Sequence, residues 1–181
     1  MEIEKELLPD TWLINLKKLN DLRGCFVKTY VKSWVRAINI GDQNEFEFAE
    51  EYYSISKKNV LRGMHFQTPP HQHKKLVFCA AGAVEDVVVD LRKGGNYGKY
   101  CRVTLDSSTP KLLMIPAGVA HGFLSLSDTS IMIYKTSTEY APENDKGVLY
   151  NSFGFKWASE NPIISERDMK HIDFPSFDSP F

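Results

Sequence analysis

Cysteine is scarce in this chain, and its spacing matches neither a metal site nor a disulfide framework. The three cysteines, Cys25, Cys79 and Cys101, lie far apart, and no CxxC pair occurs. An odd, widely spaced set favours reduced thiols over disulfides or a cysteine zinc site. We therefore interpret all three as packing residues.

An excess of one charge and long apolar runs are also lacking. Lys and Arg number 22 against 23 Asp and Glu, a net charge of −1, so no overall basic field attracts nucleic acid or an anionic membrane. The longest uncharged apolar stretch, residues 76–84, is too short to cross a bilayer, and the first ten residues do not resemble a secretory signal. We expect a cytoplasmic protein without nucleic-acid or membrane partners.

Helical signals are few, whereas strand signals recur at short intervals. We predict short helices at residues 33–40 and after Ser165, where a capping serine precedes acidic residues. Neither a βαβ alternation nor a fixed repeat occurs. Turn-forming clusters separate runs rich in β-branched and aromatic residues. These runs are residues 11–16, 25–31, 46–56, 75–82, 83–91, 99–105, 111–116, 122–126 and 130–137.

Short strands with frequent turns predict an all-β fold, an antiparallel jelly roll with short peripheral helices. No Pro/Ser-rich linker divides the chain. We therefore expect a single domain, residues 1–181, with the C-terminal segment packed back on it.

Two histidine-bearing segments stand out as the candidate active site. Residues 61–75, LRGMHFQTPPHQHKK, contain three of the five histidines and lie between strand-like runs. His121 lies in IPAGVAHGF, which we expect to form a turn. Its P-x-G-x-x-H pattern resembles the second cupin motif, and residues 63–82 resemble the first.

A metal is the first alternative for these histidines. His71 and His73 would project to one side of an extended strand, and His121 could supply a third imidazole. However, metal-binding cupins carry a carboxylate ligand shortly after this pair, where the present chain has Lys74 and Lys75. Two ammonium groups repel a divalent ion instead of compensating its charge. We therefore predict a site without a metal.

A closer resemblance covers nearly the whole chain through several blocks in a fixed order. The blocks are residues 21–24 with Phe26, 57–67, 69–77, 85–92, 96–100, 115–123, 134–142 and 151–157. Together they resemble the dTDP-4-dehydrorhamnose 3,5-epimerases, metal-free cupin enzymes of deoxysugar synthesis. The resemblance implies a cupin jelly roll that works as a homodimer without a cofactor.

The resemblance also implies the reaction. Its substrate would be a nucleotide-diphospho-4-keto-6-deoxyhexose, epimerised at C3, C5 or both by removal of a proton next to the C4 ketone. Such reactions serve deoxysugar and polysaccharide biosynthesis, including O-antigen and lipopolysaccharide.

Four catalytic residues are implied by the same resemblance. His65 matches the base, Asp168 the carboxylate that orients its ring, Lys75 the cation beside the developing oxyanion, and Tyr134 the residue that returns a proton to the opposite face. Each also has a purely structural interpretation, as a core histidine, a helix N-terminal acid, an edge lysine and a core tyrosine. Their joint match to one family pattern favours the catalytic interpretation.

Five further residues match substrate contacts of that family. Arg23 and Arg62 match the arginines that bind the pyrophosphate, which suits guanidinium groups. His121 would lie near the hexose, and Phe26 and Tyr140 match aromatic residues beside the nucleotide. Surface ion pairing, a backbone-bonded turn histidine and core packing are the structural alternatives for these positions.

Three residues depart from the family at positions associated with recognition. The family usually has Glu at the position of Lys28, Gln at Glu50 and Asn at Tyr52. Thymine N3 donates a hydrogen bond and suits a carboxylate, whereas cytosine N3 accepts one and suits an ammonium group. Lys28 therefore suggests a CDP-linked substrate. Tyr52 and Glu50 could change the hexose and restrict epimerisation to one carbon.

Two alternative functions and one candidate dimer interface are also considered. A related cupin 4-ketohexose isomerase and a non-catalytic sugar-nucleotide-binding cupin are the alternatives to an epimerase. For the homodimer, we expect the segment from Trp12 to Leu16 to cross to a partner sheet and cover an open edge.

Overall fold

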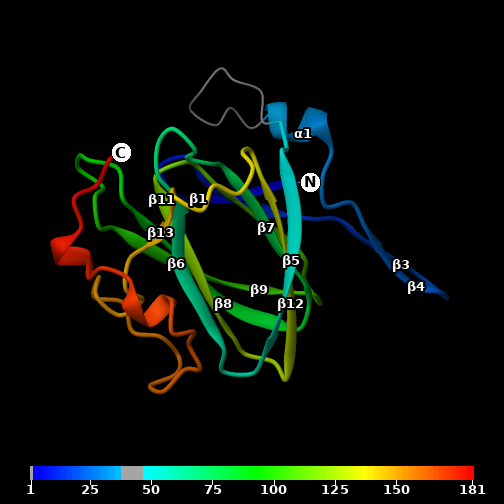
Figure 1. The fold of residues 1–181 in the computed structure, drawn as a ribbon. Coiled ribbons are helices and arrows are strands. Elements are labelled where there is room, and N and C mark those ends of the chain that lie inside the picture. Colours follow the sequence, from blue (N-terminus) through cyan, green and yellow to red (C-terminus); the bar gives the residue numbers. More distant parts are fainter. Residues whose placement is uncertain (1, 38–46) are drawn as a thin grey trace.

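The fold consists of two antiparallel sheets packed face to face (Figure 1). The computed structural model describes residues 2–37 and 47–181. The six-stranded sheet has the order β1 (Glu2–Leu8), β2 (Thr11–Asn15), β10 (Lys111–Ile115), β7 (Lys75–Ala81), β12 (Thr129–Thr136) and β5 (Glu50–Lys57). The five-stranded sheet has the order β13 (Asp145–Gly147), β6 (Leu61–Gln67), β11 (Val119–Ser125), β8 (Ala83–Asp90) and β9 (Tyr100–Asp106).

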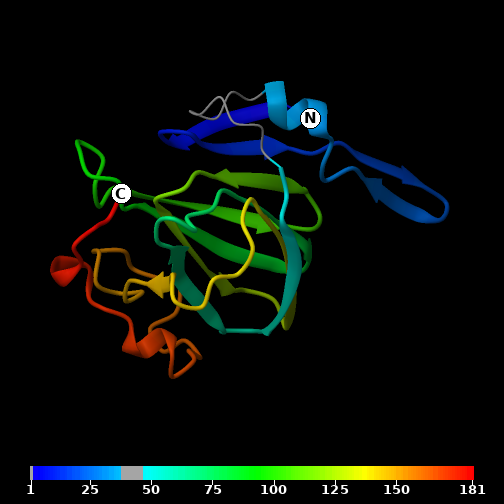
Figure 2. The same cartoon turned by 45° about the horizontal axis from the view of Figure 1, so that its top comes forward.

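A separate hairpin and three short helices complete the described elements. The hairpin, β3 (Lys18–Asp21) and β4 (Gly24–Val27), extends away from the two sheets, as Figures 1 and 2 show. The helices are α1 (Lys32–Ala37) and the 3-10 turns η1 (Asp168–Lys170) and η2 (Phe174–Ser176). None of the described helices is long and apolar enough to cross a membrane.

Side-chain alternation along the strands builds the central core between the sheets. In β12, Met132, Tyr134 and Thr136 are buried, whereas the residues between them are partly exposed. The core joins residues of both sheets, among them Val77 and Val88. Period-two burial of this kind follows from strand geometry. β12 lies between β7 and β5, and its inward side chains enter the space between the two sheets.

Two further apolar clusters cover the outer faces of the sheets. On the six-stranded sheet, Ile14 and Leu76 pack with Val35 of α1. On the five-stranded sheet, Met64 and Phe66 of β6 pack against aromatic residues of the C-terminal segment. This cover holds the C-terminal segment, and with it η1, against β6 (Figure 1).

The predicted all-β jelly roll with short helices is confirmed, and several boundaries are corrected. Strand 25–31 ends at Val27, and strand 46–56 corresponds to β5, its residue 46 lying outside the described part. Helix 33–40 corresponds to α1, which ends at Ala37; residues 38–40 lie outside the described part. The histidine-bearing segments are largely strand, since β6 contains His65 and β11 contains His121.

The expectation that Trp12 to Leu16 crosses to a partner was wrong for this chain. Residues 11–15 form β2, which pairs with β1 and β10 of its own sheet. Leu13 and Ile14 are buried on its two faces, one in the central core and one under α1. The strand is therefore an interior part of the fold.

Candidate active site

A cavity of about 390 Å³ opens between the two sheets. A volume of this size suits a small organic ligand. Strands of both sheets contribute side chains to its wall. Eight of the residues predicted from the sequence line it, namely Glu50, Tyr52, Arg62, His65, Lys75, His121, Tyr134 and Tyr140.

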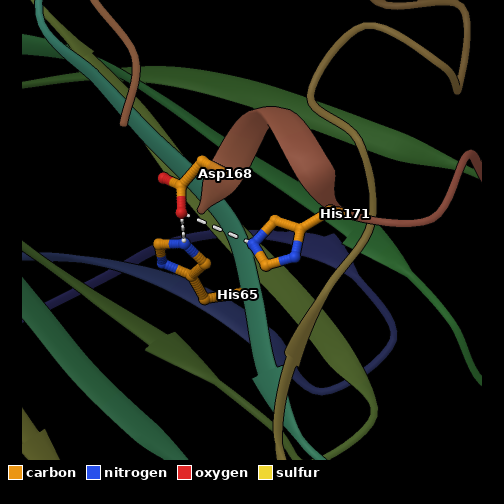
Figure 3. Close-up of side chains that lie close together, drawn as sticks. All are labelled: His65, Asp168 and His171. Carbon is orange, nitrogen blue, oxygen red and sulfur yellow. Dashed lines mark hydrogen bonds and ion pairs between the residues drawn. The ribbon is translucent and has the colours of Figure 1, made fainter. Parts of the chain in front are cut away.

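His65 and Asp168 form a hydrogen-bonded pair at this cavity. Nε2 of His65 lies 2.8 Å from Oδ1 of Asp168, whose side chain is buried (Figure 3). An ionised carboxylate accepts a hydrogen bond from Nε2–H, which leaves Nδ1 as the basic nitrogen of the ring. Burial lowers the pKa of His65 against the opposing effect of Asp168, so the imidazole is neutral and able to accept a proton.

Local backbone structure places Asp168 beside β6. The Ser165 hydroxyl accepts the Asp168 N–H (3.1 Å) at the start of η1, and the Gly63 N–H donates to Asp168 Oδ2 (3.2 Å). Gly63 has a φ of +149°, and a Cβ there would lie 2.6 Å from Gly122 Cα, so only glycine suits this crossing of β6 and β11. Burial raises the pKa of Asp168, but His171, His65 and the Gly63 N–H together lower it well below its usual range.

Lys75 supplies a buried cation to the same cavity. It is 5% exposed, and its Nζ donates a hydrogen bond to the His65 carbonyl oxygen (3.0 Å). Burial lowers the pKa of Lys75 to about 8, although Asp145 and Asp86 act in the opposite direction. The ammonium is therefore charged at neutral pH and can stabilise a nearby oxyanion.

Tyr134 lines the cavity from the sheet opposite His65. It lies on β12, whereas His65 lies on β6, and its hydroxyl shares a hydrogen bond with Ser54 Oγ (3.4 Å). Burial raises the pKa of Tyr134, which keeps the phenol protonated as a donor. Tyr52, its cross-strand neighbour on β5, stacks on the ring at a centroid distance of 4.8 Å.

A second histidine–aspartate pair lies deeper in the wall. His121 Nε2 is 2.8 Å from Asp86 Oδ2, and both side chains are buried. Burial raises the pKa of Asp86 while His121 lowers it. The imidazole of His121 lies near the Tyr134 ring in an edge-to-face arrangement, with centroids 6.2 Å apart, and both side chains line the cavity.

Two arginines and two carboxylates lie among the remaining wall residues. Arg62 donates to Ser56 Oγ (3.0 Å) and to the Ile55 carbonyl oxygen. Arg167, which the sequence analysis missed, pairs with Asp145 (2.6 Å). Glu50 accepts the Tyr140 N–H (2.7 Å), which ties β5 to the loop that carries Tyr140.

Three predicted substrate contacts lie outside the cavity of their own chain. Arg23 and Phe26 lie in the projecting hairpin, and Lys28 follows it directly. The Arg23 side chain is 89% exposed and pairs with Asp21, and Phe26 is 59% exposed. The structure therefore does not bring these residues to the cavity that holds His65.

The histidines considered for a metal do not come together in the described part of the chain. His73 lines the cavity, and burial lowers its pKa to about 2, whereas His71 is exposed. The cluster with suitable donor atoms, all within 4.8 Å, is instead His65, Asp168 and His171. We assign no metal to it, because Nε2 of His65 is hydrogen-bonded to Asp168 and the Lys75 ammonium, which donates to the His65 carbonyl oxygen, places a positive charge nearby.

The sequence analysis also missed Asp86 and His171. Asp86 follows Glu85 in β8 and precedes three valines, and a charge buried in such a strand needs a partner, which could have indicated its pairing with a histidine. His171 follows Asp168 by three residues, a spacing that faces the same side of a short helical turn.

Comparisons with known proteins agree on one family. The family model described as dTDP-4-dehydrorhamnose 3,5-epimerase matches residues 5–176. A dTDP-4-dehydrorhamnose 3,5-epimerase of Shigella flexneri is 35% identical over 182 residues, covering 98% of each chain.

Solved structures give the same result. A dTDP-6-deoxy-D-glucose-3,5-epimerase of Legionella pneumophila, in complex with dTDP-4-keto-L-rhamnose, superposes with a TM-score of 0.90 at 30% identity, covering 98% of this chain and 94% of that one. A 3'-monoepimerase of Streptomyces bikiniensis, in complex with dTDP-quinovose, gives 0.87 at 26% identity, covering 97% and 88%.

Proposed function

Because the chain belongs to the dTDP-4-dehydrorhamnose 3,5-epimerase family, a family of isomerases, we propose that it epimerises a nucleotide-diphospho-4-keto-6-deoxyhexose. The observation that carries this proposal is the His65–Asp168 pair on one sheet and the Tyr134 phenol on the other, both at one cavity. A base and an acid on facing walls can remove a proton from one side of a carbon and return one to the other.

The reaction begins with transfer of a proton from the carbon next to the C4 ketone to Nδ1 of His65. The electron pair of the broken C–H bond moves into the ring and onto the ketone oxygen, which gives an enolate. Asp168 stabilises the imidazolium through Nε2, and the Lys75 ammonium stabilises the oxyanion. Tyr134 then donates its phenolic proton to the opposite face of the carbon; solvent returns a proton to Tyr134 and takes the extra proton from the His65 imidazolium.

Tyr52 supports a reaction restricted to one carbon. Its ring lies directly on that of Tyr134, so it takes space beside the proposed proton donor. The hexose must turn or shift for Tyr134 to reach a second carbon, and a bulky neighbour hinders that movement. The structural similarity to a 3'-monoepimerase makes this a chemistry that the fold can perform.

The carrier nucleotide has two candidates. The ligands named with the related structures are dTDP-sugars, which favours dTDP. Lys28 favours CDP through its complementarity to cytosine N3. Because Lys28 lies outside the cavity of its own chain, the second candidate requires that the hairpin reaches the site of another copy.

A homodimer would bring the hairpin residues to the substrate. Leu22 is fully exposed and Leu19 is 50% exposed, apolar surface on an element that extends away from the sheets. We propose that the hairpin of each copy completes the cavity of the other with Arg23, Phe26 and Lys28. We further propose one domain over residues 1–181 and a cytoplasmic place in deoxysugar biosynthesis, where nucleotide sugars are made.

Deuterium incorporation tests the proposed function. The protein would be incubated in D₂O with dTDP- and CDP-linked 4-keto-6-deoxyhexoses, and NMR would read exchange at C3 and C5. We expect label at one carbon, and label at both would remove the role given to Tyr52. A protein that binds these compounds without exchange would be a binding module. Calorimetry with dTDP and CDP decides the carrier, since tighter binding of dTDP refutes the role given to Lys28.

A further inference from the structure

His171 lies behind the proposed base and has no role in the reaction so far. Its Nε2 is 3.4 Å from Asp168 Oδ1, the same oxygen that accepts the hydrogen bond of His65 Nε2–H at 2.8 Å (Figure 3). The side chain is 10% exposed, and apart from this long charge-pair contact Nε2 has no hydrogen-bond partner in the described part of the chain. The two imidazoles meet edge to face, with centroids 5.6 Å apart. One carboxylate oxygen therefore lies between two ring nitrogens.

The fold reserves space for the His171 ring. A Cβ at Gly147 would lie 2.5 Å from two atoms of that ring, and Gly147 pairs directly with His65 across β13 and β6. The following residue, Ile172, is bound to the segment directly after β13 by a bridge to Val148 and a hydrogen bond from the Leu149 N–H. The position of His171 is thus fixed from both the η1 side and the β13 side.

We propose that His171 is a positioning residue of the proton transfer: its Nε2–H holds the Asp168 carboxylate in the orientation that keeps His65 Nδ1 free to act as the base. This inference rests on the proposed function. His65 and the Gly63 N–H each contact one oxygen of Asp168, and His171 adds a second contact to Oδ1, which further restricts rotation of the carboxylate. His171 acts through Asp168 and contacts no reacting atom.

The shared oxygen also couples the two imidazoles electrostatically. His171 lowers the pKa of His65, in the same direction as burial and Lys75, and it lowers the pKa of Asp168. Loss of His171 would therefore raise the pKa of His65, and the acidic limb of the activity profile would move to higher pH. Other charged groups beside His171 stay in place in such a variant; they are Asp145, Lys146, Arg167, Lys170 and Asp178.

Two substitutions of His171 separate a donor from a space-filling ring. His171→Gln can place an amide N–H near the position of Nε2 without a titratable group, and His171→Phe keeps a ring without a donor. The contact is long for a hydrogen bond, and a typical hydrogen bond contributes about 0.5–1.5 kcal/mol, so we expect His171→Phe to lower kcat by roughly two- to tenfold with KM little changed. His171→Gln should recover most of kcat but retain the shifted acidic limb.

A third variant moves the ring without removing it. Gly147→Ala introduces a methyl group that must displace the His171 ring, and we expect it to lower kcat and to shift the acidic limb as His171→Phe does. Gly95→Ala is the matched control, because its Cβ meets no atom within 4 Å. Thermal unfolding and dTDP binding are measured for all variants, so that lost folding is distinguished from lost positioning.

NMR of ¹⁵N-labelled histidine without substrate provides a readout that does not depend on turnover. We expect the titration of His65 to move to higher pH in His171→Gln and Gly147→Ala relative to the wild type and Gly95→Ala. An unchanged His65 titration together with an unchanged pH profile in His171→Gln would overturn the proposal. If the wild type turns over no nucleotide sugar but His65 titration still depends on His171, the proposed function fails while the coupling stands.

Discussion

Asp168 determines which nitrogen of His65 can act, because it occupies Nε2 and leaves Nδ1 for the substrate. Asp168→Asn replaces the carboxylate with a neutral amide that cannot stabilise the imidazolium. General-base catalysis contributes roughly 10²–10⁴-fold to the rate, and we expect the substitution to lower kcat by a factor in that range. Steady-state kinetics measure the effect, with Asp178→Asn, an exposed carboxylate paired to Lys93, as the control. An Asp168→Asn enzyme with wild-type kcat would remove the dyad from the mechanism.

Lys75 and His65 together predict the pH dependence of the reaction. The oxyanion needs a charged Lys75, and burial lowers its pKa to about 8, so activity is lost as pH rises through that value. The base must be neutral, and burial lowers the pKa of His65 below its ordinary 6.5, so activity persists below that pH. A bell-shaped kcat/KM profile would show both limbs.

A charge that does not titrate tests the assignment of the alkaline limb. Arginine remains protonated in proteins, so Lys75→Arg should move the loss of activity above pH 8 out of the measured range, whereas Lys74→Arg should leave the limb in place. An alkaline limb unchanged in Lys75→Arg would assign it to another group.

Strand β6, which carries the proposed base His65, approaches β11 closely at Gly63. Gly63→Ala would force a Cβ to 2.6 Å from Gly122 Cα at a φ of +149°. A non-glycine residue in such a conformation costs on the order of 1–3 kcal/mol of unfolding free energy, and the clash adds to it. Chemical denaturation measures the change. Gly95→Ala should lie within about 0.5 kcal/mol of the wild type, as surface substitutions usually do. Equal stability of the two variants would contradict the described crossing.

Strands in which apolar and polar residues alternate could be predicted from the sequence. A strand exposed at a sheet edge and a strand that carries site residues lack this alternation and were missed. Residues 130–137 match β12 closely, because apolar and polar residues alternate there. β1 was missed, because its sequence EIEKELL is charged and mostly exposed at a sheet edge. β6 was not among the predicted strands, because Arg62, Gly63 and His65 serve the site and interrupt an apolar pattern.

The site could be predicted by family resemblance more than by residue pattern. The family and the isomerase class are confirmed, and His65 and Asp168 meet although 103 positions separate them. The sequence pattern alone gives no reason for that contact, which depends on the C-terminal segment packing on β6. A single chain does not explain the roles expected for Arg23, Phe26 and Lys28, because these residues are proposed to contact substrate bound to a second copy.

At the scale of the whole molecule, the hairpin predicts complementation between copies. Neither His65→Ala nor Arg23→Ala should be active alone, but a mixed dimer contains one site with both substitutions and one with neither. We expect activity to appear on mixing, and light scattering should give a dimer. Mixed variants that exchange subunits without gaining activity would place Arg23 at the site of its own chain or outside any site.

The central claim is that His65 removes a proton from carbon next to a ketone, and its most direct test is deuterium exchange by His65→Gln with dTDP binding retained. The wild type and His71→Gln, which changes an exposed histidine, should label the sugar from D₂O. His65→Gln should bind the nucleotide with wild-type affinity and introduce no label on the same timescale. Label entering at the wild-type rate in His65→Gln would contradict the account.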